Sequence, residues 1–419
     1  MLLLYSNCIR KLVLDLPVDH LKEIEPELSA MFPILTDVSI SARHSYTRHP
    51  RLEEFPEWRP VAILLSPIRY LKLLLVKTPW VPGRFQNLVE FFIHDQRHAG
   101  FAPPMEIFLG ILESSPQLAV LSVANAGPRL APGTTTLPPA TRVIQLHNLQ
   151  RLYLGQRDAY DVGWILIHLK IPISAHVKNF VESFYRPTAV PLELVFDLAL
   201  PNHPGFPHLT NLHRCTYAVD PWPTCIIAAP NFDFCINWDN IMCSHFDSFM
   251  MPFFHRAMAA GVIEDLTVVH EQPVGYNTTT LQWDQIFGTL HSLQKLRVEQ
   301  SPDLLDNSVW AMFQTSPNHA LQDLCLSHLV FGKEPQGEGG GGNQKELVER
   351  LVDYCAERNQ RGCRLHSLVI EAPLHPPPGL ASMLAPYVDR FEIREKVLSD
   401  ENVRDDEFGS RWVFDSLRA

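Results

Sequence analysis

Apolar and polar positions along the chain follow a six-residue pattern, apolar-x-x-apolar-x-apolar, which occurs eleven times. Clear examples are LAVLSV at 118–123, LQRLYL at 149–154 and LQKLRV at 293–298. The matches start at residues 9, 35, 68, 88, 118 and 149 and, after a gap, at 263, 293, 321, 365 and 388. Three apolar positions coincide often by chance, but on either side of the gap the starts recur at fairly regular intervals. This spacing predicts a fold built from repeated units.

The last three residues of each match have the pattern apolar-x-apolar. This alternation predicts a β-strand with one face in the core. Several intervals between the matches place apolar residues at helical spacing. The expected helices are His20–Phe32, Met105–Ser115, Trp283–Leu290, Val309–Phe313 and Lys345–Arg358. Strand and helix units of roughly 20 to 30 residues have the leucine-rich-repeat period. We therefore expect an α/β fold, an irregular leucine-rich-repeat solenoid or horseshoe with a parallel β-sheet on its concave face and helices outside.

Residues 155–262 carry only a degenerate form of the pattern. Leu209 and Leu212 begin a unit that lacks its third apolar position, and residues 192–200 are predicted to form a buried strand. Apolar helices are expected at 161–171 and 244–260. We expect one solenoid domain over residues 1–397, followed by a charged cap or tail at 398–419.

A glycine-rich stretch at 332–343 contains four consecutive glycines, Gly339 to Gly342. No Lys-Ser/Thr pair follows them, and Glu334 and Glu338 would repel a phosphate. The stretch is therefore expected to be a flexible loop and not a phosphate-binding loop.

Charge and composition narrow the expected partners and compartment. Asp and Glu number 46 and Lys and Arg 35, so the formal net charge is −11, which argues against nucleic acid as a partner. The eight cysteines show no even ladder of spacings and predict reduced thiols, as in the cytosol or nucleus. Asn7 and Arg10 interrupt the apolar start before a signal peptide could form, and no run approaches the ~18 uncharged apolar residues of a membrane span. No membrane association is expected.

The repeated LxxLxL strands in an acidic, proline-rich chain, with IRKLVLDLP at the start and SPQLAVLSV and NLQRLYLG further on, resemble the leucine-rich-repeat region of fungal F-box/leucine-rich-repeat proteins. The resemblance implies a horseshoe that selects a protein substrate. In the full-length family it also implies an N-terminal F-box that docks on the Skp-type adaptor of a cullin ubiquitin ligase. Because the repeat already begins at Ile9, we expect the F-box itself to be missing. The family's Asn or Cys after each strand is replaced by Ala126, Ser301 and Leu329, so the curvature is expected to be irregular.

Residues for metal or covalent chemistry are not found in a recognisable arrangement. The best metal candidate is the set Cys225, Cys235, Cys243 and His245, but its spacings of ten, eight and two positions lack the short Cys pairs of zinc sites. No His-Glu-x-x-His, Gly-x-Ser-x-Gly or Walker A motif occurs. We therefore expect no metal, no cofactor and no catalytic residue, and the chain is not expected to be an enzyme.

Side chains that alternate with the patterned apolar residues are expected on the concave face of the sheet. Aromatic residues and arginine carry much of the energy of protein interfaces. We expect these ten residues to contact a partner: Tyr70, Phe92, Arg151, Tyr153, Lys295, Arg297, Asp323, Glu371, Arg390 and Glu392. Their mixed charges favour a protein ligand that carries both signs.

Three hypotheses for the function follow from the sequence. The first is a non-enzymatic recognition module that resembles the substrate-binding part of an F-box protein, with Skp-type adaptor and cullin as further partners if an F-box function is supplied. The second is a free-standing leucine-rich-repeat scaffold with no ligase link. The third is a hydrolase or metalloenzyme hidden in residues 160–261, which would need convergent polar groups in a pocket there.

Overall fold

A computed structural model of the chain describes residues 7–17, 20–21, 23–24, 32–43, 67–76, 78, 80–83, 85–94, 102–131, 136–156, 159–181, 208, 212–220, 224–237, 263–270, 290–300, 320–327, 342–372 and 379–395. The chain divides into two compact units. The first contains Met1–Ile263 and Pro273–Leu281, and the second contains Glu264–Gln272 and Gln282–Ala419. Both are built from a largely parallel β-sheet with few helices, so the expected α/β class with parallel strands is confirmed at that level.

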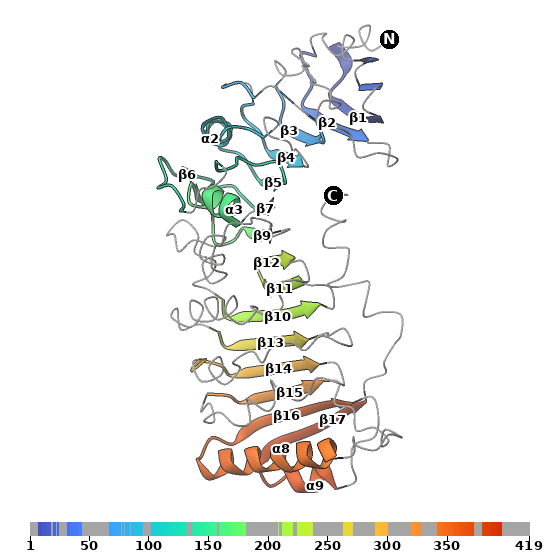
Figure 1. The fold of residues 1–419 in the computed structure, drawn as a ribbon, viewed down its shortest axis with the longest axis vertical. Helices are drawn as coiled ribbons and strands as arrows, with labels where there is room; N and C mark the ends of the chain where they lie inside the picture. The colour runs from blue at the N-terminus through green and yellow to red at the C-terminus, as the bar shows by residue number, and fades with distance from the viewer. Residues whose placement is uncertain are drawn as a thin grey trace. The chain divides into compact units, whose positions relative to one another are not determined.

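The sheet of the first unit has the order β1-β2-β3-β4-β5-β7-β9-β12-β11-β10 (Figure 1). Its strands are β1 (Lys11–Pro17), β2 (Asp37–Arg43), β3 (Tyr70–Leu74), β4 (Glu90–His94), β5 (Val120–Ala124), β7 (Arg151–Gln156), β9 (His176–Val181), β10 (Arg214–Asp220), β11 (Thr224–Ala229) and β12 (Phe232–Asn237). From β1 to β9 each strand pairs in parallel with its neighbour.

Strands β10, β11 and β12 depart from this arrangement because they form an antiparallel meander. The last of the three, β12, pairs in parallel with β9. Along the sheet these three strands therefore follow β9 in the order β12, β11, β10, which is the reverse of their order in the sequence. Strands β10 and β12 run in the same direction as the parallel strands, and β11 runs opposite to them. The degenerate pattern of residues 155–262 did not predict this meander.

The patterned residues of successive strands lie in register and form the core. Val38, Leu71, Phe91, Leu121 and Leu152 occupy one continuous row across β2, β3, β4, β5 and β7, and each is at most 2% exposed. The face of the sheet that carries these rows is the core face, and the opposite one is here called the outer face. Strand alternation as predicted from the sequence is therefore confirmed on these strands.

Two helices of the first unit pack on the core face. Helix α2 (Met105–Glu113) fills the interval predicted for it, and its Phe108 ring lies 6.4 Å from that of Phe91 on β4. Helix α3 (Ala159–Leu166) covers β7 and β9. The predicted helix at 161–171 was wrong at both ends, because α3 begins two residues earlier and ends at Leu166, and residues 169–170 form a strand. A separate two-stranded parallel sheet, β6 (Ile144–Gln145) and β8 (Leu169–Lys170), lies beside them (Figure 1).

The second unit repeats the same architecture with five parallel strands in the order β13-β14-β15-β16-β17. They are β13 (Asp265–His270), β14 (Lys295–Gln300), β15 (Asp323–Ser327), β16 (Leu365–Ala372) and β17 (Val388–Glu395). Leu266, Leu296, Leu324, Leu368 and Phe391 form one core row in register. The pattern predicted all five strands.

Helices α8 (Gly342–Gln360) and α9 (Leu380–Leu384) pack beside β16 and β17 (Figure 1). Helix α8 includes the predicted segment Lys345–Arg358 but begins at Gly342, so the expected loop at 332–343 ends earlier than predicted. Arg358 of α8 is completely buried, donates a 2.5 Å hydrogen bond to the carbonyl of Leu321 and lies 5.7 Å from the ring of Tyr354. The hydrogen bond to Leu321 joins α8 to the chain that leads into β15.

Several sequence expectations fall outside the described residues. These are the helices at 244–260, Trp283–Leu290 and Val309–Phe313, the strand at 192–200 and the tail at 398–419. Of these residues only Leu290 is described. Of the predicted helix His20–Phe32, residues 20, 21, 23 and 24 are described and helical, whereas Phe32 is described and does not belong to a helix. Within the part of the chain that is described, no helix is both long and apolar enough to cross a membrane.

Candidate functional site on the outer face

All ten residues expected to contact a partner lie on strands and alternate with core residues. In the first unit they are Tyr70 on β3, Phe92 on β4, and Arg151 and Tyr153 on β7. In the second unit they are Lys295 and Arg297 on β14, Asp323 on β15, Glu371 on β16, and Arg390 and Glu392 on β17. The ten residues are thus divided into two groups, one in each unit.

Two residues of the first group, Phe92 and Tyr153, belong to an aromatic cluster that also contains Lys72, His94 and Ser122. Tyr70 and Arg151 lie on the same face but outside this cluster. The Lys72 ammonium lies 6.0 Å from the centre of the Phe92 ring, which is the range of a cation–π contact. The His94 ring is 6.3 Å from Phe92 on the same strand and 6.4 Å from Tyr153, two strands away. Strand β5 contributes only small side chains to the outer face between them, so the larger groups of β4 and β7 can meet above it.

His94 and Ser122 form the one pair in this cluster with the residue types of a general base and a nucleophile. The Nε2 atom of His94 lies 2.8 Å from the Ser122 hydroxyl oxygen. Both residues are buried, and aromatic rings flank the imidazole on two sides. Ser122 is 5% exposed and His94 1%, so neither side chain is open to a substrate in this arrangement.

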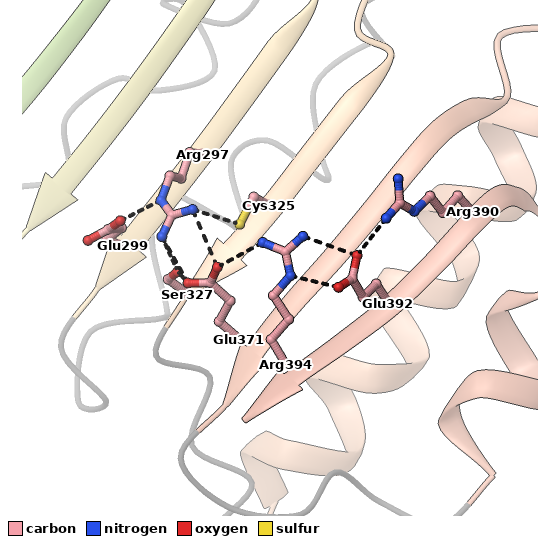
Figure 2. Close-up of polar contacts among 8 residues, drawn as sticks. All are labelled: Arg297, Glu299, Cys325, Ser327, Glu371, Arg390, Glu392 and Arg394. Carbon is pink, nitrogen blue, oxygen red and sulfur yellow. Dashed lines mark hydrogen bonds and ion pairs between the residues drawn. The ribbon is translucent and has the colours of Figure 1, made fainter. Parts of the chain in front are cut away.

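Four residues of the second group, Arg297, Glu371, Arg390 and Glu392, belong to a charge cluster that also contains Glu299, Cys325, Ser327 and Arg394 (Figure 2). Lys295 and Asp323 lie on the same face but outside this cluster. The strand register explains why the residues of the cluster meet. Glu299, Ser327, Glu371 and Arg394 occupy one row across β14 to β17, and Arg297 and Cys325 lie one step earlier in the next row.

Arg297 and Glu371 form the centre of the charge cluster. Two nitrogens of the Arg297 guanidinium approach the two Glu371 oxygens at 2.8 and 3.4 Å. The strands that carry them are separated by β15, and two strand spacings amount to about 9.6 Å. The small residues Cys325 and Ser327 of β15 leave room for this contact, and Ser327 itself donates a hydrogen bond to Glu371. Glu371 is buried, which sequence alternation did not predict.

The edge strand β17 continues the same network toward solvent. Arg394 donates two hydrogen bonds to Glu392, at 2.8 and 3.1 Å, and one of its nitrogens lies 3.7 Å from Glu371. Arg390 donates a single bond of 3.2 Å to Glu392. The hydrogen bond from Arg394 lowers the pKa of Glu392, and Arg390 acts in the same direction. Glu392 is therefore ionised under ordinary conditions and holds both guanidinium groups in place.

The chemistry available to Cys325 follows from its surroundings. Burial raises the pKa of its thiol, and the neighbouring Glu371 adds to that effect, although Arg297 opposes it. For Arg297, burial disfavours the cation, but the hydrogen bond with Glu299 and the nearby acidic groups raise its pKa overall. Cys325 is thus a protonated thiol beside a permanent cation, and it lacks the thiolate character of a catalytic nucleophile.

The metal candidate receives no support from the described residues. Cys225 pairs with Ile236 and Cys235 pairs with Ile226, so the two cysteine positions belong to opposite faces of the β11–β12 pair. Cys243 and His245 lie outside the described residues. Among the residues that are described, no group of three or more His, Cys, Asp and Glu side chains could hold a metal ion.

Seven members of the two clusters are not among the ten sequence-based candidates. Lys72, Glu299 and Arg394 are charged residues that alternate with core residues as the candidates do. The other four are His94, Ser122, Cys325 and Ser327. Strand alternation, applied beyond the charged and aromatic residues, would have placed all four on the outer face. Their small size or their position after the last patterned residue made them inconspicuous in the sequence.

Comparison with known proteins assigns this chain to no family. No protein-family model matches the sequence. No curated protein is significantly similar to it either. The function must therefore be inferred from the residues and their arrangement.

Proposed function

We propose that this protein is a non-enzymatic recognition module that binds another protein through the outer face of its parallel sheets. We propose further that the sheets belong to an irregular leucine-rich-repeat solenoid, with the outer face on its concave side. In this proposal the chain resembles the substrate-binding part of an F-box protein of a cullin-type ubiquitin ligase. A free-standing scaffold without a ligase link is the alternative.

One observation carries the proposal, namely that successive strands align their outer-face residues in rows. Tyr70, Glu90, Val120 and Arg151 form such a row in the first unit, although they come from four separate segments of the sequence. Lys295, Asp323, Ser367 and Arg390 form one in the second unit. A wide array of aromatic and charged side chains suits a protein surface, whereas small molecules are usually bound in concave, mostly apolar pockets.

The experiment is affinity purification of tagged protein from cells of its own source, with mass spectrometry of the proteins that co-elute. Arg151→Glu and Lys295→Glu place a negative charge on the outer face of each unit, and at least one is expected to reduce recovery of the partner. Lys170→Glu is the matched control, because Lys170 is exposed on the short strand β8, away from the outer face. Partner recovery that none of these outer-face changes alters would contradict the proposal.

The same experiment separates the two forms of the proposal. Recovery of a Skp-type adaptor and a cullin would support a substrate receptor, and the remaining co-eluting proteins would be candidate substrates. One stoichiometric partner without adaptor or cullin would support a scaffold with no ligase link.

A further inference from the structure

Cations and carboxylates are unequally exposed on the outer face of the second unit. The side chains of Arg390 and Arg394 are 69% and 49% exposed, whereas those of Glu392 and Glu371 are 33% and 9% exposed. Glu299 is also less exposed than its partner Arg297. The acids therefore form a lower layer beneath Arg390 and Arg394, whose guanidinium groups lie nearest to solvent, whereas Arg297 is about as exposed as Glu392, at 34% and 33%. An approaching partner meets positive charge first.

The lower layer also holds the arginines in position. Glu392 accepts two hydrogen bonds from Arg394 and one from Arg390 (Figure 2). A guanidinium has five N–H donors, and the single bond of Arg390 leaves most of them available to a ligand. Because the side chains are already ordered by these ion pairs, binding costs less conformational entropy than it would with free arginines.

Lys295 extends the positive surface across the sheet. It is exposed on β14 and lies in the same row as Arg390 on β17. Three strand spacings separate the two positions, which is about 14 Å. An extended peptide spans this distance with roughly four to five residues, at about 3.3 Å per residue.

We infer that the outer face of β14 to β17 binds an acidic segment of a protein partner. One carboxylate of that segment accepts hydrogen bonds from Arg390 and Arg394, and another pairs with Lys295. The inference rests on the proposed function and specifies the chemistry of the partner. A peptide carries separate carboxylates with neutral residues between them, which fits a face where Asp323 and Glu392 stand among the cations. A continuous phosphate backbone would meet these acids, and the net charge of −11 opposes it as well.

The test uses a displayed library of random 12-residue peptides, selected on the full-length protein and sequenced. Selected peptides are expected to be enriched in Asp and Glu at a spacing of four to five residues. One of them, synthesised with a fluorescent label, should bind at least 10-fold more weakly to Arg390→Ala and to Lys295→Ala in fluorescence anisotropy. Arg390→Lys should retain part of the affinity, because a lysine keeps the charge but not the paired donors.

Arg361→Ala is the matched control for loss of an exposed arginine. Arg361 is paired with Glu357 on α8 and is 44% exposed, but it does not lie on the sheet. Its replacement should leave peptide affinity unchanged. Selection of neutral or basic peptides, or an equal loss of affinity in Arg361→Ala, would overturn the inference. So would labelled single-stranded RNA that binds the parent protein and competes with the peptide.

The outcomes also separate this inference from the proposed function. If a partner recovered from cells binds Arg390→Ala and Lys295→Ala as well as the parent but is lost with Arg151→Glu, the acidic-segment inference fails and outer-face recognition stands. If none of these changes affects the partner, both fail. Arg390 is exposed and makes one side-chain bond, so Arg390→Ala should keep the parent's circular dichroism spectrum and Tm.

Discussion

Glu371 is a buried carboxylate within reach of two guanidinium groups and one hydroxyl. A carboxylate in such a place is retained because each of its oxygens has a positive or hydrogen-bonding neighbour. The residues around it are held by the same contacts. The order of the outer face in the second unit therefore depends on this one side chain.

Replacement of Glu371 by Gln should lower the free energy of unfolding by about 1–3 kcal/mol, because it leaves donors of Arg297 and Arg394 without their acceptor charge. Denaturant unfolding followed by circular dichroism measures the change. The control is Glu357→Gln in the exposed Arg361 pair, for which a change within about 0.5 kcal/mol is expected. Equal effects of the two substitutions would show that burial of Glu371 contributes nothing.

His208 makes stability depend on pH. Burial lowers its pKa from 6.5, the hydrogen bond between Nε2 and the Ala175 carbonyl opposes the shift, and His176 adds to it. The folded state therefore takes up the proton at lower pH than the unfolded state does. The contribution of His208 to stability is constant above about pH 6.5 and is lost as the pH falls through and below that value.

His208→Gln should reduce this dependence, because an amide can donate to the Ala175 carbonyl without titrating. The measurement is the difference in unfolding free energy between pH 7.5 and pH 5.5, compared between the variant and the parent. A difference as large in the variant as in the parent would assign the effect to other groups among the chain's nineteen histidines.

At the scale of elements, β9 shows how a strand escapes sequence analysis. Asn179 occupies the register position of Leu154 on β7, where the pattern requires an apolar residue. It is 1% exposed, and within the described residues its Oδ1 and Nδ2 atoms have no hydrogen-bond partner. Such a residue costs stability, because its polar atoms lose water and gain nothing in return.

Asn179→Leu restores the apolar position and should raise the free energy of unfolding by about 1 kcal/mol. A thermal melt should show this as a higher Tm. Asn179→Asp tests the same site in the opposite direction and should destabilise the protein, since it buries a charge. A lower Tm for the leucine variant would mean that the asparagine has a function in the folded protein that its surroundings do not show.

The position of a strand within the sheet should set the cost of the same substitution. Leu121 lies on β5, between two other strands, and is completely buried, whereas Leu14 lies on the terminal strand β1 and is partly exposed. Leu121→Ala should cost about 2–5 kcal/mol in unfolding free energy and Leu14→Ala about 1 kcal/mol. Denaturant unfolding measures both. Equal costs would contradict a core that is continuous across the strands.

The sequence predicted the patterned strands and their parallel pairing well, but it did not predict how β9, β10, β11 and β12 pair. Alternation is a local property, so all eleven matches lie on strands or lead into them. In the unit of β10, the buried Leu212 and Cys215 hold the first and second pattern positions, so Leu212 is the first position and not the second as the expected unit from Leu209 had it. A cysteine in the second position, where most other units have leucine, concealed this register. Which strand lies beside which depends on contacts between distant segments, so neither the β10–β12 meander nor the contact between Arg297 and Glu371 could be predicted.

At the scale of the whole molecule, most strands pair with the strand that comes before or after them in the sequence. In the second unit the paired core residues Leu266, Leu296, Leu324, Leu368 and Phe391 follow one another along the chain, one on each successive strand. Such a structure gains stability mainly from interfaces between adjacent strands. Damage to one strand should therefore spread to its neighbours before it reaches distant ones.

Leu324→Ala in β15 should accelerate amide hydrogen exchange most in β14, β15 and β16, and should leave β3 to β5 in the first unit unchanged. Exchange followed by mass spectrometry of peptides measures each strand separately. A uniform loss of protection over both units would show instead that the chain unfolds as one cooperative body.

The late pairing of β9 with β12 has a consequence for the growing chain on the ribosome. Val177 of β9 pairs with Phe232 of β12, which is synthesised only after β10 and β11, whereas its other partner, Leu152 of β7, has already been made. At synthesis rates of roughly 5–20 residues per second, one edge of β9 stays unpaired for about 3–11 s until β12 has been synthesised. An unpaired strand edge is a template for association with other chains. Aggregation during translation should therefore begin at β9, and chaperones that bind nascent chains should be most needed at this point.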